Sequence, residues 1–217
     1  MKASNTSPKP PAVTDLKFCQ RDYLVNLLGL IYYHSPWVAE TLYDDYLVNT
    51  TNEISSIRDL FNIMKRIVDC STNEQKNTLL CAYPDLCKKV SDLSQSSQEE
   101  QSRAGLQSLT EDERTTILSI NKTYREKFGF PFILAVRNAT KYTVLSAIKA
   151  RVNNSMEVEF AAALAQVHKI AWMRLLGTFT INNRKGFLTC HVLDTATRRP
   201  GMSINFLLKI IEKQFIE

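Results

Sequence analysis

The chain has 217 residues, of which 44% are hydrophobic, so it can bury one sizeable core but not two full domains. Its net charge of +5 comes from scattered Lys and Arg residues, which argues against a nucleic-acid-binding protein. No run approaches the ~20 apolar residues of a membrane span, and the N-terminus lacks the apolar stretch of a signal peptide, so we expect no membrane partner and no secretion.

The cysteines are odd in number and lack the paired spacing of a zinc site. They are Cys19, Cys70, Cys81, Cys87 and Cys190. Reduced thiols in an intracellular compartment are therefore expected, either in the cytoplasm or in the peroxisome, and no metal site is expected. The C-terminal residues Phe215-Ile-Glu217 are not a peroxisomal tripeptide of the Ser-Lys-Leu type.

Helix-forming residues dominate the body of the chain, which predicts an all-α fold. The polar, proline-bearing residues 1–15 are expected to form a flexible tail. Apolar residues at helical spacing then predict four helices. These helices cover residues 20–34, 36–48, 57–68 and 73–82, the last ending at Tyr83-Pro84.

Four more helices are predicted in the second half, which makes a helical bundle of about seven to eight helices. They cover residues 97–108, 110–127, 139–152 and 156–176. Ser97 with Glu100, and Thr110 with Glu113, have the spacing of capping boxes. The pattern becomes strand-like beyond Gly177, so we expect a helical domain at 16–177, a linker at 178–186 and a short C-terminal β-like appendage at 187–217.

The segment Tyr124-Arg-Glu-Lys-Phe-Gly-Phe-Pro-Phe132 ends a helix with unusually specific chemistry. Gly129 closes the helix, Pro131 prevents a new one, and aromatic residues gather around both. This segment resembles the signature of the decarboxylases that act on 2-oxo-4-hydroxy-4-carboxy-5-ureidoimidazoline (OHCU), the last step of urate degradation. The resemblance runs from about Leu16 to Leu176. It implies a helical homodimer that converts this small molecule to (S)-allantoin without metal or organic cofactor.

Ser97-Gln-Glu-Glu-Gln101 matches the family's Ser-x-x-Glu-Gln element. The resemblance implies that Glu100 is catalytic and that Ser97, Gln98, Glu99 and Gln101 contact the substrate. A capping box uses the same Ser and Glu to satisfy free amides, so a plain helix start explains the pattern as well.

The residues after Pro131 have a counterpart in the family, where backbone groups line the substrate pocket. They are Phe132, Ile133, Leu134, Ala135 and Val136. Their alternative role is that of a buried apolar connector, and both roles are compatible. Apolar walls would also exclude water from the site.

Arg174 shares one face of the last predicted helix with an apolar stripe that points into the bundle. The stripe consists of Phe160, Leu164, Val167 and Ala171. A guanidinium at this position needs an anionic partner, which can be a carboxylate of the protein or a carboxylate of the substrate, unless it reaches solvent at the end of the helix. The family also has an active-site arginine at this point.

Tyr83-Pro84 departs from the family, which has a catalytic histidine followed by proline. Pro84 retains the implied substrate contact. A phenol with a pKa near ~10 can donate a proton or hydrogen bond, but it is a much poorer base than an imidazole with a pKa near ~6.5. His34 and His168 are expected to have structural or surface roles. Of the two, His34 is the better candidate to take over the role of the missing catalytic histidine.

Residues Leu188 to Gly201 resemble the first strand of the transthyretin-like 5-hydroxyisourate hydrolases. His191 matches their first catalytic histidine, but the partners that this site needs have no counterpart, so we expect a truncated fragment. Three hypotheses follow for the whole chain: a decarboxylase slowed by Tyr83, a pseudoenzyme that binds a metabolite or partner, or a helical interaction module without a ligand.

Overall fold

The computed structural model describes residues 10–48, 54–85, 109–136 and 139–179. These ranges contain helices and no strand, so the predicted all-α class is confirmed for the described part of the chain. The elements in chain order are the 3₁₀ helix η1 (Val13–Phe18), α1 (Arg21–Leu28), α2 (Trp37–Thr41), the π-helical stretch η2 (Leu42–Leu47), α3 (Ile57–Cys70), α4 (Asn73–Ala82), α6 (Glu111–Phe128), α7 (Lys141–Arg151) and α8 (Met156–Phe179).

Several predictions fall on residues that are not described. The helix expected over 97–108 and the appendage expected over 187–217 lie outside the described ranges, as does the linker apart from residues 178 and 179. At the other end, η1 begins at Val13, so helical structure starts inside the segment expected to be a tail.

Side-chain caps set the starts of α3, α4, α6 and α7, and the capping box predicted at Thr110 is confirmed. Thr72 and Thr110 form complete capping boxes with Gln75 and Glu113. Each threonine accepts a hydrogen bond from the amide three residues on, and the Gln or Glu side chain accepts one from the threonine amide. Helix α6 ends at Gly129, whose φ of 77° belongs to the left-handed region that favours glycine.

The helix expected over 20–34 was predicted too long. Helix α1 stops at Leu28, and the chain then runs through turns to Ser35, with His34 at a φ of 46°. The Ser35 hydroxyl donates to the Tyr33 carbonyl, and Pro36 then opens α2. Because these turns replace a regular helix, Tyr32 and Tyr33 can reach different parts of the core.

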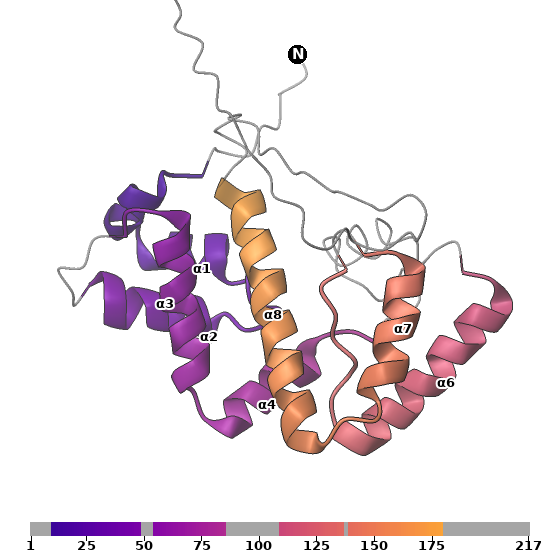
Figure 1. The fold of residues 1–217 in the computed structure, drawn as a ribbon. Coiled ribbons are helices and arrows are strands. Elements are labelled where there is room, and N and C mark those ends of the chain that lie inside the picture. The colour runs from indigo at the N-terminus through magenta and orange to yellow at the C-terminus, as the bar shows by residue number, and fades with distance from the viewer. Residues whose placement is uncertain (1–9, 49–53, 86–108, 137–138, 180–217) are drawn as a thin grey trace, which may run out of the picture. The chain divides into compact units, whose positions relative to one another are not determined.

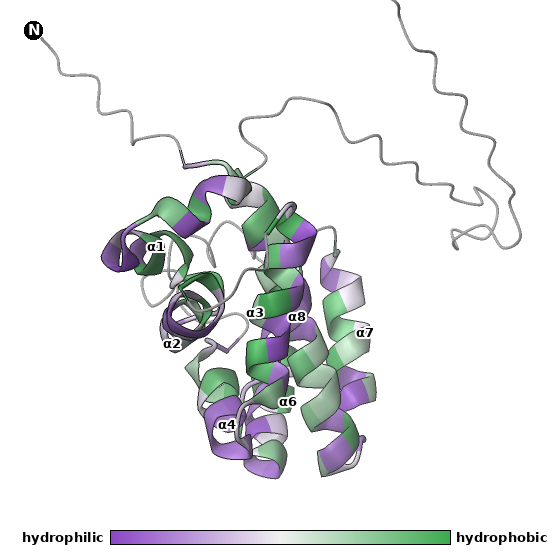
Figure 2. Ribbon diagram, turned by 90° about the vertical axis from the view of Figure 1, so that its left-hand side faces the viewer, coloured by the Kyte–Doolittle hydropathy of each residue, from purple (hydrophilic) through white to green (hydrophobic). Residues whose placement is uncertain are grey.

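Helix α8 is the central element of the described bundle. It packs against α3, α4 and α6, and Figure 1 shows α3 on one side of it and α7 on the other. Figure 2 shows hydrophobic and hydrophilic residues interspersed along α3, as expected for an amphipathic helix. Fully buried side chains from four helices meet in the core: Leu24, Leu60, Met64, Ile117 and Val167. None of the described helices is long and apolar enough to cross a membrane.

Candidate functional site

Tyr83 lies at the C-terminal end of α4, where its side chain is only 6% exposed. Its amide donates to the Leu80 carbonyl, and Pro84 follows immediately, which ends the helix where the sequence predicts. The same corner is tied to the end of α6, since Arg125 forms an ion pair with Asp85 at 2.8 Å. The Cys81 thiol also donates to the Gly129 carbonyl at 3.5 Å. Tyr83 is therefore held close to the aromatic segment that starts at Tyr124.

Tyr33 brings Tyr83 and Arg174 together, although these two residues come from different helices. The rings of Tyr33 and Tyr83 lie with their centroids 5.2 Å apart. The guanidinium carbon of Arg174 lies 5.5 Å from the centroid of the Tyr33 ring. One aromatic side chain from the turns between α1 and α2 therefore contacts both predicted site residues.

Arg174 follows the predicted apolar stripe of α8. Val167 and Ala171 are fully buried, and Phe160 and Leu164 are partly buried against the core, so the inward face is confirmed. The half-buried Arg174 donates from Nη1 to the Leu30 carbonyl at 3.3 Å and faces the Tyr33 ring. These two contacts orient the guanidinium at the junction of α8 with residues 30–33.

Tyr33 was missed as a site residue because it falls inside the helix predicted over residues 20–34. Gly29 and the Ser35-Pro36 pair, which flank it, were the signals that this stretch turns. The contacts themselves join residues far apart along the chain, which local periodicity does not reveal.

A chain of polar side chains runs beside the site, from the buried Tyr32 and His168 to the exposed Asp69. The Tyr32 hydroxyl and His168 Nδ1 are 2.8 Å apart, and His168 Nε2 lies 3.0 Å from Asp69 Oδ1. Burial lowers the pKa of His168 from its ordinary 6.5, although Asp69 acts in the opposite direction. Burial also raises the pKa of Tyr32, and Tyr83 and Asp69 add to that rise. His168 thus fills the structural role expected for it.

His34 lies on the surface, in a T-shaped contact with the Tyr33 ring at 4.3 Å. It therefore contacts the same aromatic side chain as Tyr83, from the solvent side.

The wall segment, defined as Phe132 to Val136, has no regular secondary structure and is mostly buried, with Leu134 half-buried. The Ala135 amide donates to Gln166 Oε1 of α8 at 3.1 Å, and the Ile133 carbonyl accepts from Arg151 Nη1 of α7 at 2.8 Å. The predicted buried connector is thus confirmed. The lining of a substrate pocket by this segment stays a prediction.

The Ser-x-x-Glu-Gln element lies outside the described residues. This applies to Ser97, Gln98, Glu99, Glu100 and Gln101. The described part of the predicted site therefore consists of Tyr83, Pro84, Arg174 and the wall segment.

Known proteins resemble this chain over most of its length. The family model described as OHCU decarboxylase matches residues 19–176. The 2-oxo-4-hydroxy-4-carboxy-5-ureidoimidazoline decarboxylase of Haloferax volcanii is 38% identical over 159 residues, which are 73% of this chain and 90% of that protein. The uric acid degradation bifunctional protein of Bacillus sp. (strain TB-90) is 37% identical over 155 residues, which are 71% of this chain but 30% of that protein.

A solved structure is also similar to this chain. A crystal structure of (S)-allantoin synthase superposes with a TM-score of 0.66 at 46% identity. The match covers 88% of this chain and 62% of that one, so this chain spans less than two thirds of that protein. Because the family model, a full-length relative and a solved structure all agree over the helical domain, the chain belongs to the OHCU decarboxylase family.

Proposed function

We propose that this chain converts OHCU to (S)-allantoin by decarboxylation, in the degradation of urate. Membership of the family supports this activity. The observation that carries it within the molecule is the Tyr33 ring, which contacts both Tyr83 and Arg174. A cation and a proton donor that both contact one aromatic ring suit a reaction that releases carbon dioxide and then protonates a carbanion.

In the proposed reaction, Arg174 holds an anionic group of the substrate through charge-assisted hydrogen bonds. The bond between the ring carbon and the carboxylate breaks, carbon dioxide leaves, and the electron pair delocalises into the ring. The Tyr83 hydroxyl then gives its proton, on one face, to the neighbouring ring carbon that carries the ureido group, which sets the S configuration. The hydroxyl on the decarboxylated carbon becomes the ring carbonyl of the product, and its proton passes to the ring nitrogen. Glu100 works with Tyr83 in this step, and the phenolate recovers its proton from solvent before the next turnover.

The remaining predicted residues would hold the substrate in place. We assign substrate contacts to Pro84, to Ser97, Gln98, Glu99 and Gln101, and to backbone groups of the wall segment. The buried side chains of that segment support the assignment, because they keep the wall dry and so strengthen polar contacts to the substrate.

The test is a stopped assay with freshly generated substrate, following (S)-allantoin by its circular dichroism. Wild type should form (S)-allantoin faster than the spontaneous reaction, and Arg174→Ala should remove most of that acceleration. A wild-type rate equal to the spontaneous rate would reject the proposed activity.

A second candidate is a binding protein that has lost turnover. Tyr83 favours it, because the resemblance places a catalytic histidine there and a phenol is a poor base near neutral pH. Calorimetry separates the two: a pseudoenzyme binds (S)-allantoin in a manner abolished by Arg174→Ala, yet shows no turnover. Loss of both binding and turnover would instead leave the helical interaction module.

We also propose a homodimer located in the cytoplasm or the peroxisome. The family resemblance supports the dimer, and the unpaired cysteine pattern supports an intracellular compartment. Light scattering at two protein concentrations tests the first, and localisation of a tagged chain tests the second.

A further inference from the structure

Glu159, in the first turn of α8, is a fully buried carboxylate with several donors around it. Arg151 Nε donates to its Oε1 at 2.9 Å, and Asn154 Nδ2 donates to its Oε2 at 2.7 Å. The Tyr124 hydroxyl donates to Oε1 as well. A buried charge persists only when it is paired and hydrogen-bonded, and this carboxylate is both.

Arg151, the last residue of α7, divides its donors between this carboxylate and the wall segment. Its Nε and Nη2 donate to Glu159, whereas Nη1 donates to the Ile133 carbonyl at 2.8 Å. The guanidinium carbon also lies 4.6 Å from the centroid of the Phe132 ring. One planar side chain therefore holds two consecutive residues of the wall.

Because peptide bonds are planar, hydrogen bonds made by the residues on either side of Leu134 also fix the orientation of its own N–H and C=O groups. The Ile133 carbonyl and the Leu134 amide belong to one planar trans unit and point in opposite directions. The Leu134 carbonyl and the Ala135 amide form the next unit, and the Ala135 amide donates to Gln166. Anchoring on α7 and α8 therefore fixes the directions of both backbone polar groups of Leu134, away from Arg151 and Gln166.

We propose that Gln166 and Arg151 are positioning residues that aim the N–H and C=O of Leu134 at the substrate, with Glu159 holding Arg151 in place. This rests on the proposed function, since it needs the wall segment to line the substrate pocket. One donor and one acceptor side by side match the edge of a cyclic urea or lactam, which carries an N–H next to a C=O. Leu134 is also the half-buried residue of an otherwise buried wall.

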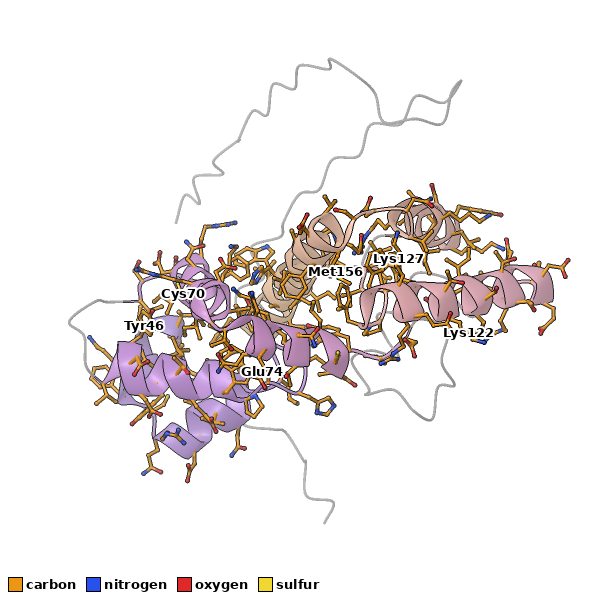
Figure 3. All side chains as sticks on the ribbon, turned by 90° about the horizontal axis from the view of Figure 1, so that it is seen from below. Tyr46, Cys70, Glu74, Lys122, Lys127 and Met156 are labelled. Atoms are coloured by element: carbon orange, nitrogen blue, oxygen red, sulfur yellow. The ribbon has the colours of Figure 1, made fainter. Side chains whose placement is uncertain are left out.

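Lys127 offers a matched control at the same end of the bundle. Its ammonium group donates to the Val152 and Asn154 carbonyls at 2.9 Å each, so it supports the turn between α7 and α8 without contacting the wall. Figure 3 labels Lys127 and Met156, where the end of α6 lies beside the start of α8. Removing this side chain therefore tests how a loss of stability alone changes substrate binding.

The experiment compares Gln166→Met, Gln166→Glu, Arg151→Lys and Lys127→Met. Gln166→Met removes the acceptor of the Ala135 amide, whereas Gln166→Glu retains a carbonyl-type oxygen. Arg151→Lys keeps a charge for Glu159 but loses the planar fork that reaches Ile133 at the same time. Each variant is measured by calorimetry with (S)-allantoin, by KM and kcat, and by thermal unfolding.

Gln166→Met and Arg151→Lys should raise Kd and KM about 3- to 10-fold, the effect of one misplaced neutral hydrogen bond, while kcat changes less. Gln166→Glu should restore wild-type KM, and Lys127→Met should lower the unfolding temperature without changing KM. Folded Gln166→Met and Arg151→Lys variants with wild-type Kd and KM would overturn the inference while leaving the proposed function intact. A wild type that neither binds nor turns over substrate overturns both.

Discussion

Replacing Tyr33 by leucine should slow the reaction while leaving the bundle folded. The side chain is 8% exposed, and leucine can fill most of its place as an apolar residue. What leucine lacks is the aromatic ring that contacts Tyr83 and the Arg174 guanidinium. Tyr33→Phe keeps that ring and removes only the hydroxyl, so it isolates the contribution of the ring.

The expected size follows from the two contacts. The Arg174 carbon lies 5.5 Å from the Tyr33 centroid, within the ~6 Å range of a cation–π interaction worth about 0.5–1 kcal/mol at a partly exposed site. The Tyr33 and Tyr83 centroids lie 5.2 Å apart, a separation at which aromatic pairs contribute about 0.5–1.5 kcal/mol. Together they amount to about 1–2.5 kcal/mol, so kcat/KM should fall about 5- to 70-fold.

Trp172→Leu is the matched control, because it also removes one ring pair and one cation–π contact from α8. Trp172 contacts the Phe61 ring at 5.2 Å and the Arg58 guanidinium carbon at 4.4 Å. The assay measures kcat/KM and the unfolding temperature for all three variants. Tyr33→Leu should be slow, whereas Tyr33→Phe and Trp172→Leu should keep near wild-type kcat/KM. Equal kcat/KM for Tyr33→Leu and Tyr33→Phe would show that the Tyr33 ring contacts do not affect the reaction rate.

Two further predictions concern stability. Because burial lowers the pKa of His168 below 6.5, the unfolded chain binds a proton that the folded chain does not as the pH falls below that value. The free energy of unfolding should therefore decrease as the pH falls from about 7.5 to 5. His168→Gln should reduce this pH dependence more than His34→Asn does. If urea titrations give both variants the same dependence of unfolding free energy on pH, the explanation is wrong. Gly129→Ala should destabilise the protein by about 1–2 kcal/mol, because Gly129 has a φ of 77°. Gly177→Ala should stabilise it, because Gly177 lies inside α8. Steric clashes do not enter either prediction, since neither new Cβ has a neighbour within 4 Å. The same sign for both changes in thermal unfolding would contradict the conformational explanation.

The sequence predicts helix ends well where a side chain closes the backbone locally. The Thr110–Glu113 box starts α6, and Gly129 ends it, because each acts on amides or dihedral angles within a few residues. The helix predicted over 20–34 ends early, at Leu28, because no such local signal decides where it stops. Apolar residues continue at helical spacing through Ile31, but the backbone turns because Tyr32 and Tyr33 gain contacts with α8 and α4 that no local pattern encodes.

Buried polar residues were the other feature that local patterns did not reveal. Glu159 reads as an acidic residue in the first turn of a helix, a position that the helix dipole favours on the surface. It is instead fully buried, since Arg151, Asn154 and Tyr124 converge on it from separate elements. Arg174, by contrast, lies on the predicted face of α8, because it extends an apolar stripe of regular spacing.

We propose that this family member still decarboxylates its substrate with Tyr83 at the position where the resemblance implies a catalytic histidine. The most direct measurement compares the initial rate of (S)-allantoin formation by wild type, by Tyr83→His and by the spontaneous reaction, with freshly generated substrate. We predict that wild type exceeds the spontaneous rate and that Tyr83→His raises kcat further, up to the ~10²- to 10⁴-fold typical of a general acid–base group. A wild type at the spontaneous rate would contradict this activity, whether or not Tyr83→His is faster.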